Sequence, residues 1–161
     1  LDADGVLTEG KVTYNDEGVE AKSFDIKDGH GVKLLMRGKI EVAIITGRKS
    51  KALLHRARDL GITLLYQKVL DKIEVYNQIL KERGLTDEEV CYIGDDLVDL
   101  PLLRRAGFSV AVADGIDEVK EEADYILVWK SYYGKTVIPE FRNNFEVIKD
   151  YGDSILLNKS P

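Results

Sequence analysis

Short apolar runs alternate along the chain with longer segments in which apolar residues recur every three or four positions. The runs have the length of buried strands, and the longer segments are typical of helices with one buried face. Strands that are apolar throughout and separated by helices predict a parallel sheet covered on both faces. The strands are expected at residues 40–45, 62–66, 90–93, 108–112 and 125–129, and the helices at residues 31–37, 50–60, 71–83, 97–106, 116–123 and from 137 onward.

The fold class that follows is α/β, doubly wound (Rossmann-like), with a mainly parallel sheet. No linker, repeat or low-complexity tract divides the sequence, so we expect a single domain over residues 1–161, with a C-terminal segment at about 130–161. Leu1 is expected to end a strand, and we therefore expect further residues upstream of it. Asp28 is expected to cap the first helix.

Residues 11–24 follow a different pattern. Two short alternating stretches flank Asn15-Asp16-Glu17-Gly18, which is a turn sequence, and they predict a projecting β-hairpin. We expect this hairpin to project over the opening loop or to pair with another subunit.

Composition and charge narrow the class of protein. The 161 residues carry a net charge of −6, with 44% hydrophobic and 32% charged residues, a balance typical of a folded globular chain. An acidic chain is not expected to bind nucleic acid or an anionic membrane, and an anionic substrate would need a local basic site or a metal. The single cysteine, Cys91, is expected as a buried structural thiol and fits a cytoplasmic protein. We expect no membrane span and no signal peptide.

Four loops that follow expected strands carry residues suited to chemistry, at the edge where doubly wound folds bind ligands. In the first, strand periodicity puts Asp2 and Asp4 on the same side, where they can hold a hard cation and leave one carboxylate as a nucleophile. In the second, Thr46, Gly47 and Arg48 offer a hydroxyl, a backbone N–H and a guanidinium, which suit a phosphate.

The other two loops add a cation and more carboxylates. Lys72 stands at a helix start, where an ammonium opposes the helix dipole, and Asp95 and Asp96 follow a strand with Asp99 one turn later. Each loop by itself has an ordinary explanation: an acidic turn, a strand-to-helix turn, a surface lysine, or an N-cap at Asp96. Together they favour a functional site, because carboxylates gathered at one sheet edge cost stability unless a cation is bound.

These motifs resemble those of the haloacid dehalogenase superfamily of phosphotransferases, and within it the 3-deoxy-D-manno-octulosonate 8-phosphate (KDO 8-phosphate) phosphatase family. The resemblance covers residues 1 to about 129. It rests on Asp2-Ala3-Asp4-Gly5-Val6-Leu7-Thr8, Phe24 with Asp28-Gly29-His30-Gly31, Val42-Ala43-Ile44-Ile45-Thr46-Gly47-Arg48, Gly61-Ile62-Thr63, Tyr92-Ile93-Gly94-Asp95-Asp96-Leu97 and Ser109-Val110-Ala111-Val112-Ala113-Asp114.

The resemblance implies a hydrolase that works through an aspartyl-phosphate. Asp2 would attack phosphorus, and Asp4 would protonate the leaving alcohol and then activate water. Mg²⁺ would be held by the Asp2 carboxylate, the Asp4 backbone carbonyl and Asp95. Thr46 and Lys72 would hold the phosphoryl oxygens.

Further roles are implied for residues around that centre. Asp96 would support the metal site, and Asp99 would orient Lys72. Members of this superfamily often carry a cap domain, but no insertion in this sequence is large enough for one, so the hairpin at residues 11–24 is the only candidate for a cap. The resemblance also implies a homotetramer in which a neighbouring subunit closes the site. Substrate contacts are expected from Asp28, Gly47, Arg48 and Lys72.

The implied substrate is an eight-carbon sugar acid phosphate of lipopolysaccharide biosynthesis, and Arg48 can pair with its carboxylate. A related branch that acts on nine-carbon sialic/KDN-type sugar 9-phosphates tends to carry Glu after the Thr-Gly, so Arg48 favours the eight-carbon sugar. The family's usual Gly-Gly-x-Gly-Ala-x-Arg-Glu segment is altered here. Thr136 replaces a Gly and Pro139 takes the Arg position, and Lys135 or Arg142 could compensate.

Two other classes remain as alternatives. One is a non-catalytic oligomerisation domain of a sugar-acid nucleotidyltransferase, which shares a similar fold. Against it, every catalytic position of this chain holds a competent residue. The other is a phosphorylation-switched receiver domain, which accepts phosphate on an Asp that ends the third strand. This chain has Tyr66-Gln67-Lys68 there, which argues against a receiver.

Overall fold

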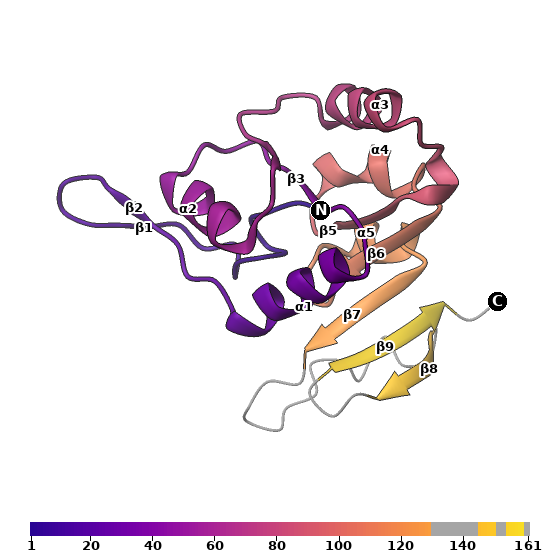
Figure 1. Ribbon diagram of the computed structural model, residues 1–161. Helices are drawn as coiled ribbons and strands as arrows, with labels where there is room; N and C mark the ends of the chain where they lie inside the picture. The colour runs from indigo at the N-terminus through magenta and orange to yellow at the C-terminus, as the bar shows by residue number, and fades with distance from the viewer. Residues whose placement is uncertain (130–144, 151–153, 160–161) are drawn as a thin grey trace. The chain divides into compact units, whose positions relative to one another are not determined.

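The computed structural model describes residues 1–129, 145–150 and 154–159 (Figure 1). The internal contacts of the chain divide it into two compact units, residues 1–79 and 80–161, and each is described by itself. The single domain expected from the sequence stays a prediction. The altered segment around Thr136 and Pro139 lies outside the described residues.

The first unit is built on a parallel pair of strands. β3 (Ala43–Ile45) pairs with β4 (Leu64–Tyr66), in register from Ala43 opposite Leu64 to Ile45 opposite Tyr66. Leu1 joins β3 through two backbone hydrogen bonds, from its own nitrogen to the Ala43 oxygen and from the Ile45 nitrogen to its oxygen, each 3.0 Å long. These bonds hold Leu1 alongside β3, but the structure assigns no strand at Leu1, so the expectation that Leu1 ends a strand stays a prediction.

One helix follows the hairpin in sequence, and one follows each strand of this parallel pair. They are α1 (Ile26–Arg37), α2 (Lys51–Leu60) and α3 (Lys72–Arg83). Ser50 caps α2 by accepting a hydrogen bond from the Leu53 nitrogen, and Gly61 ends it in a left-handed conformation with φ of 83°. The apolar faces of α1 and α2 share a core with the opening loop. Its buried members are Ala3, Leu7, Val32, Ile44, Leu53, Ala57, Leu60 and Ile62.

α1 begins earlier than the sequence pattern predicted. Its N-cap is Asp25, whose side chain accepts a hydrogen bond from the Lys27 nitrogen, so the expectation of a cap at Asp28 is wrong. The glycine in its first turns has a packing reason, because a Cβ on Gly29 would lie 3.0 Å from a Leu60 methyl group. Close approach of α1 to α2 therefore outweighs the poor helix propensity of glycine.

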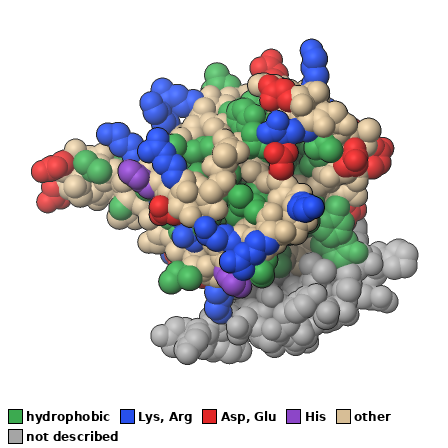
Figure 2. Space-filling view, in the orientation of Figure 1, with side chains coloured by type: hydrophobic (Ala, Val, Ile, Leu, Met, Phe, Trp, Pro, Cys, Tyr) green, Lys and Arg blue, Asp and Glu red, His purple; other side chains and the backbone are tan. Residues whose placement is uncertain are grey.

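The hairpin expected at residues 11–24 is present. β1 (Thr13–Tyr14) and β2 (Glu20–Ala21) pair antiparallel, and Figure 1 shows the hairpin extending away from the helices of its own unit. In Figure 2 it stands out with acidic side chains at its tip and hydrophobic side chains along it. Its exposed apolar side chains are Val12, Tyr14 and Val19.

The second unit has a sheet of five described strands in the order β5-β6-β7-β9-β8. β5 (Cys91–Gly94), β6 (Phe108–Val112) and β7 (Tyr125–Trp129) are parallel, which matches the expected fold class. The helical segments are η1 (Asp87–Glu89), η2 (Leu97–Asp99), α4 (Leu100–Leu103) and α5 (Asp117–Glu122). The largest fully buried side chains of this unit include Tyr92, Leu102, Leu103, Val119 and Ile126.

Two expectations for this unit are wrong, and a third is confirmed only in part. A helix from residue 137 onward was expected, but β8 (Phe145–Asp150) and β9 (Ser154–Lys159) are antiparallel strands, and β9 pairs with β7. The helix expected at residues 97–106 is only η2 and the four-residue α4. Cys91 is exposed at the start of β5 rather than buried. The expected C-terminal helix is wrong because β9 pairs with β7, and the local pattern of residues does not predict pairing between distant strands.

No helix in the described part of the chain is long and apolar enough to cross a membrane.

Candidate active site

Asp2 and Asp4 lie in a tight loop that follows Leu1, the residue bonded to β3. The Leu7 nitrogen donates a 2.9 Å hydrogen bond to the Ala3 oxygen, and Gly5 turns the chain with φ of 99°. A positive φ of this kind is unfavourable for residues with a side chain, so glycine suits this turn. The loop buries Asp2 and leaves Asp4 half-buried.

Lys72 reaches Asp2 from the first turn of α3. Its Nζ donates a 2.7 Å hydrogen bond to Asp2 Oδ1, and the two side chains are only 5% and 9% exposed. A buried lysine needs an ionised partner, because an unpaired charge in this environment is strongly unfavourable. The structure therefore brings together the expected nucleophile and the expected phosphate-binding cation.

Thr46 follows β3 and is buried. Its hydroxyl oxygen accepts a 3.3 Å hydrogen bond from the Arg48 nitrogen, so the hydroxyl hydrogen can be donated elsewhere, as a phosphate contact requires. The loops after β3 and β4 hold each other in place. The Val69 nitrogen bonds the Thr46 oxygen at 3.1 Å, and the Ser50 nitrogen bonds Gln67 Oε1 at 2.6 Å.

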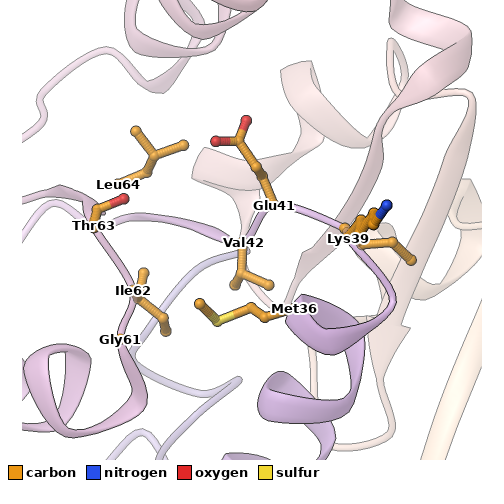
Figure 3. Close-up of a pocket in the computed structure, with 9 residues that line it drawn as sticks. Met36, Lys39, Glu41, Val42, Gly61, Ile62, Thr63 and Leu64 are labelled. Carbon is orange, nitrogen blue, oxygen red and sulfur yellow. The ribbon is translucent and has the colours of Figure 1, made fainter.

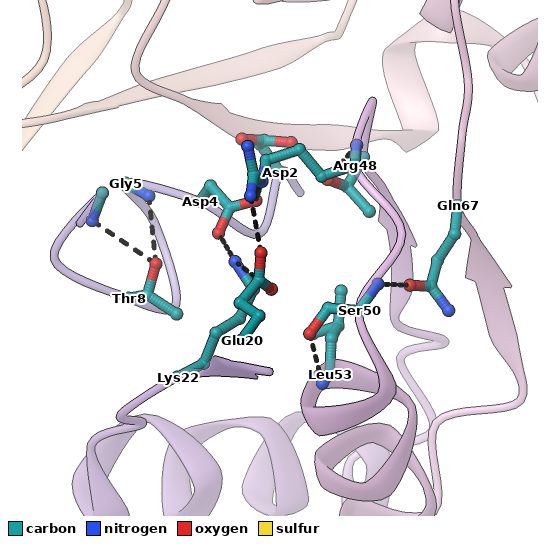
Figure 4. A network of polar contacts seen from close by, with 12 residues as sticks. Asp2, Asp4, Gly5, Thr8, Glu20, Lys22, Arg48, Ser50, Leu53 and Gln67 are labelled. Carbon is teal, nitrogen blue, oxygen red and sulfur yellow. Dashed lines mark hydrogen bonds and ion pairs between the residues drawn. The ribbon is translucent and has the colours of Figure 1, made fainter. Parts of the chain in front are cut away.

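The hairpin supplies two charged residues that the sequence did not single out. Lys22 forms an ion pair with Asp4 Oδ1, and Glu20 accepts a 2.5 Å hydrogen bond from Arg48 Nη2 (Figure 4). The bond to Glu20 is the main reason that the pKa of Arg48 is raised. The sequence did hold a signal for this pair. Glu20 and Lys22 carry opposite charges two positions apart in an expected strand, so their side chains point to the same face.

The loop after β5 is organised by Asp99, which is fully buried. It accepts hydrogen bonds from the Tyr92 hydroxyl at 2.6 Å and from the Asp95 and Asp96 nitrogens at 3.1 and 3.3 Å. A Cβ on Gly94 would lie 2.7 Å from Asp99 Cγ, so only glycine fits beside it. Asp96 is the N-cap of η2, which confirms the N-cap expected at this position from the sequence.

Asp28 lies in the first turn of α1 and has a pKa raised to about 6, because burial and then the nearby Asp25 disfavour its charged form, while Arg56 favours that form. Asp25 caps α1 and Arg56 belongs to α2. Neither residue is part of the opening loop, so these contacts do not support a substrate contact for Asp28. A cavity of about 170 Å³ near the end of α1 is lined by Met36, Val42 and Ile62 (Figure 3). It lies where β3 and β4 begin, opposite to the strand ends that carry the acidic loop.

Known proteins with similar sequences and structures decide the family. A family model described as haloacid dehalogenase-like hydrolase matches residues 63–134. The KDO 8-phosphate phosphatase of Escherichia coli K12 is 43% identical over 126 residues, which are 78% of this chain and 67% of the relative.

This chain belongs to the KDO 8-phosphate phosphatase family of haloacid dehalogenase-like hydrolases.

Solved structures of the family agree with this assignment. The enzyme from Yersinia pestis matches with a TM-score of 0.76 and 44% identity, over 78% of this chain and 68% of that one. The enzyme from Moraxella catarrhalis, solved with a magnesium ion, a phosphate ion and a KDO molecule, matches with a TM-score of 0.76 and 41% identity, over 78% and 72%. The fold class and the family predicted from the sequence motifs are both confirmed.

The donor atoms in the opening loop suit the family's metal. Mg²⁺ prefers carboxylate and carbonyl oxygens, and Asp2 and Asp4 bring both kinds to one short loop. Asp4 Oδ2 is buried and has no hydrogen-bond partner among the described residues, which leaves an acceptor for a ligand. Roles for Asp95, Asp96 and Asp99 at this metal stay predictions.

Proposed function

We propose that this chain is a Mg²⁺-dependent phosphatase that hydrolyses KDO 8-phosphate to KDO and phosphate through an aspartyl-phosphate. The observation that carries the proposal is the buried 2.7 Å pair of Lys72 and Asp2 beside Asp4, in a chain with 43% identity to the Escherichia coli enzyme of that activity. A nucleophilic carboxylate held by a cation is the arrangement that phosphoryl transfer needs, because carboxylate and phosphate otherwise repel each other.

In the first step, an oxygen of Asp2 attacks phosphorus while the bond from phosphorus to the sugar oxygen breaks. Asp4 gives its proton to that leaving oxygen. Lys72 and the Thr46 hydroxyl stabilise the phosphoryl oxygens as charge moves from the attacking to the leaving side. In the second step, Asp4 takes a proton from water, the water oxygen attacks the aspartyl-phosphate, and Asp2 and phosphate are released.

The metal neutralises negative charge on the phosphoryl group when it is bound. The Asp2 carboxylate and the Asp4 backbone carbonyl would hold it from the opening loop. Asp95 would be the third ligand by the resemblance of its motif Gly94-Asp95-Asp96, and Asp99 holds its backbone nitrogen. By the same resemblance, Asp96 would support the metal site and Asp99 would orient Lys72.

Arg48 recognises the carboxylate of the sugar acid. Its side chain is 44% exposed and ends beside Glu20, so it is accessible to a ligand. A guanidinium binds a carboxylate through two parallel hydrogen bonds, which favours a sugar acid over a neutral sugar. Gly47 and Asp28 are the other proposed substrate contacts.

The enzyme acts as a cytoplasmic homotetramer in which a neighbouring subunit closes the site. The projecting hairpin supports this proposal, because it exposes Val12, Tyr14 and Val19 with few neighbours in its own unit. Size-exclusion chromatography with light scattering at micromolar protein should show a tetramer. A monomer under these conditions would contradict the assembly but not the chemistry.

A phosphate-release assay over a panel of sugar phosphates tests the activity. KDO 8-phosphate, a nine-carbon sialic-type sugar 9-phosphate and neutral sugar phosphates are compared with and without Mg²⁺, on the wild type and Asp2→Asn. We expect Mg²⁺-dependent release that is fastest with KDO 8-phosphate and absent in the variant. If the nine-carbon sugar phosphate is preferred, the interpretation of Arg48 is wrong. If the wild type releases no more phosphate than Asp2→Asn, the chain is a non-catalytic domain.

A further inference from the structure

Four charged side chains from three segments close a ring beside the opening loop (Figure 4). Asp4 pairs with Lys22, Lys22 Nζ lies 3.6 Å from Glu20 Oε1, Glu20 binds Arg48 at 2.5 Å, and Arg48 Nε lies 3.8 Å from Asp4 Oδ2. Two acids and two bases alternate around the ring, so its charges balance. Asp4 belongs to the proposed catalytic pair, whereas Lys22 and Glu20 come from the hairpin.

Lys22 is the most enclosed member of this ring. Its side chain is 1% exposed, compared with 44% for Arg48. Lysine is rarely buried this completely, and the side-chain entropy lost in fixing it is large. A lysine that served only to support the hairpin could keep its ammonium in water, as Lys11 does in its exposed pair with Glu9. The burial of Lys22 is therefore tied to the carboxylate that it contacts.

The contact distinguishes the two oxygens of Asp4. An ammonium can only donate hydrogen bonds, so Oδ1, which faces Lys22, can only accept one. Oδ2 lies 3.8 Å from Arg48 Nε, which is beyond hydrogen-bond distance. That oxygen is buried and has no hydrogen-bond partner within the described part of the chain, so it is left for a ligand.

We propose that Lys22 is a positioning residue that fixes the carboxyl group of Asp4, with Oδ2 as the atom that exchanges the proton with the leaving oxygen and then with water. This inference rests on the proposed phosphatase function. In the first step the Oδ2–H bond breaks as the bond from hydrogen to the sugar oxygen forms. In the second step Oδ2 regains a proton from the attacking water. Lys22 itself neither gains nor loses a proton.

The role predicts a dependence on the leaving group. An alkoxide is a poor leaving group and needs a proton from Asp4, whereas p-nitrophenolate leaves without one. Disturbing the Asp4 carboxyl group should therefore slow the cleavage of sugar phosphates much more than that of p-nitrophenyl phosphate. A lysine that merely stabilised the fold would change both rates in the same proportion.

The experiment measures kcat/KM for the preferred sugar phosphate and for p-nitrophenyl phosphate, since this quantity reports the steps through formation of the aspartyl-phosphate. Lys22→Met should lower the ratio of the two values at least about tenfold, within the range that general acid catalysis contributes. Lys22→Arg, which keeps a donor, should lower the ratio less. Lys11→Met is the matched control on the same hairpin and should leave the ratio unchanged.

The outcomes separate this inference from the proposed function. A ratio in Lys22→Met equal to that of the wild type overturns the positioning role, while the phosphatase function stands. A wild type that cleaves neither phosphate overturns both. If Lys22→Met does not fold, as judged by circular dichroism, the ratio in Lys22→Gln decides by the same criterion.

Discussion

The Nζ atom of Lys72 lies 2.7 Å from Oδ1 of Asp2, although the two residues are 70 positions apart in sequence. The pair joins the start of α3 to the loop after Leu1, and both side chains are buried. The pair matters for both stability and catalysis. The Lys72 ammonium compensates the buried Asp2 carboxylate, and in the proposed mechanism it also binds the phosphoryl oxygens.

Removing the cation from this pair should affect both stability and rate. Lys72→Met leaves the Asp2 carboxylate buried without its lysine, which costs about 3–5 kcal/mol in comparable buried pairs. The rate of phosphate release should fall by about 100-fold or more, as when one donor to a transition-state oxyanion is removed. Urea denaturation and the phosphate-release assay measure the two effects.

The double variant Lys72→Met with Asp2→Asn is the control for the stability effect. Replacing the carboxylate with a neutral amide removes the buried negative charge that Lys72 compensated, so the double variant should recover part of the lost free energy of unfolding while staying inactive. A double variant less stable than Lys72→Met would show that the pair is not the source of the loss.

Gly94→Ala should disturb the loop that carries Asp95. The added Cβ would lie 2.5 Å from Asp99 Cβ, and Asp99 is fully buried, so the free energy of unfolding should fall by about 1–3 kcal/mol, as for other overpacked cores. The Mg²⁺ concentration for half-maximal activity should rise, because Asp99 holds the backbone of the proposed metal ligand.

Gly31→Ala is a matched comparison for that substitution. A Cβ at Gly31 would meet nothing within 4 Å, and the residue lies inside α1. Alanine has the higher helix propensity, so the variant should be as stable as the wild type or more stable by up to about 1 kcal/mol. Equal losses in the two glycine variants would contradict the packing argument at Gly94.

Asp28 should make stability depend on pH in a defined direction. Its pKa is raised from 3.8 to about 6, mainly by burial, so the folded chain binds a proton at this carboxyl more tightly than the unfolded chain. The free energy of unfolding of the wild type relative to Asp28→Asn should therefore fall as pH rises from about 4 to about 6 and stay level above that. Urea titrations at pH 4, 5, 6 and 7.5 measure it. A difference that is constant across this range would refute the shift.

Arg48→Ala should act on specificity more than on stability. The guanidinium is 44% exposed, so its ion pair with Glu20 contributes little to stability. KM for a sugar acid phosphate should rise about tenfold or more, consistent with loss of a charge-assisted hydrogen bond, while KM for a neutral sugar phosphate stays within about twofold. Equal changes in KM for both substrates would contradict the proposed contact between Arg48 and the substrate carboxylate.

Much of this protein follows from local sequence. The cap at Asp96, the helix that ends at Leu60, the hairpin around Asn15, and the strands at residues 108–112 and 125–129 were all predicted correctly. Each depends on neighbouring residues, through a capping side chain, a turn preference or a continuous apolar run.

The errors have two causes, one long-range and one local. The segment after residue 137 was expected to be helical, yet residues 145–150 and 154–159 are strands that pair with each other, and β9 pairs with β7. Pairing between distant strands outweighs local periodicity, and one sequence does not report it. Asp28 was assigned as a helix cap, but the helix begins one turn earlier because Asp25 is better placed.

The sequence by itself determined the chemistry: two aspartates after a strand end, a threonine and glycine after another, and a lysine at a helix start, in the motifs of a phosphatase family. Only the tertiary structure decided which groups meet. It paired Lys72 with Asp2, and it brought Lys22 and Glu20 from the hairpin to Asp4 and Arg48. The physical reason is that residue type fixes what a side chain can donate or accept, whereas contacts between distant segments depend on how the chain packs.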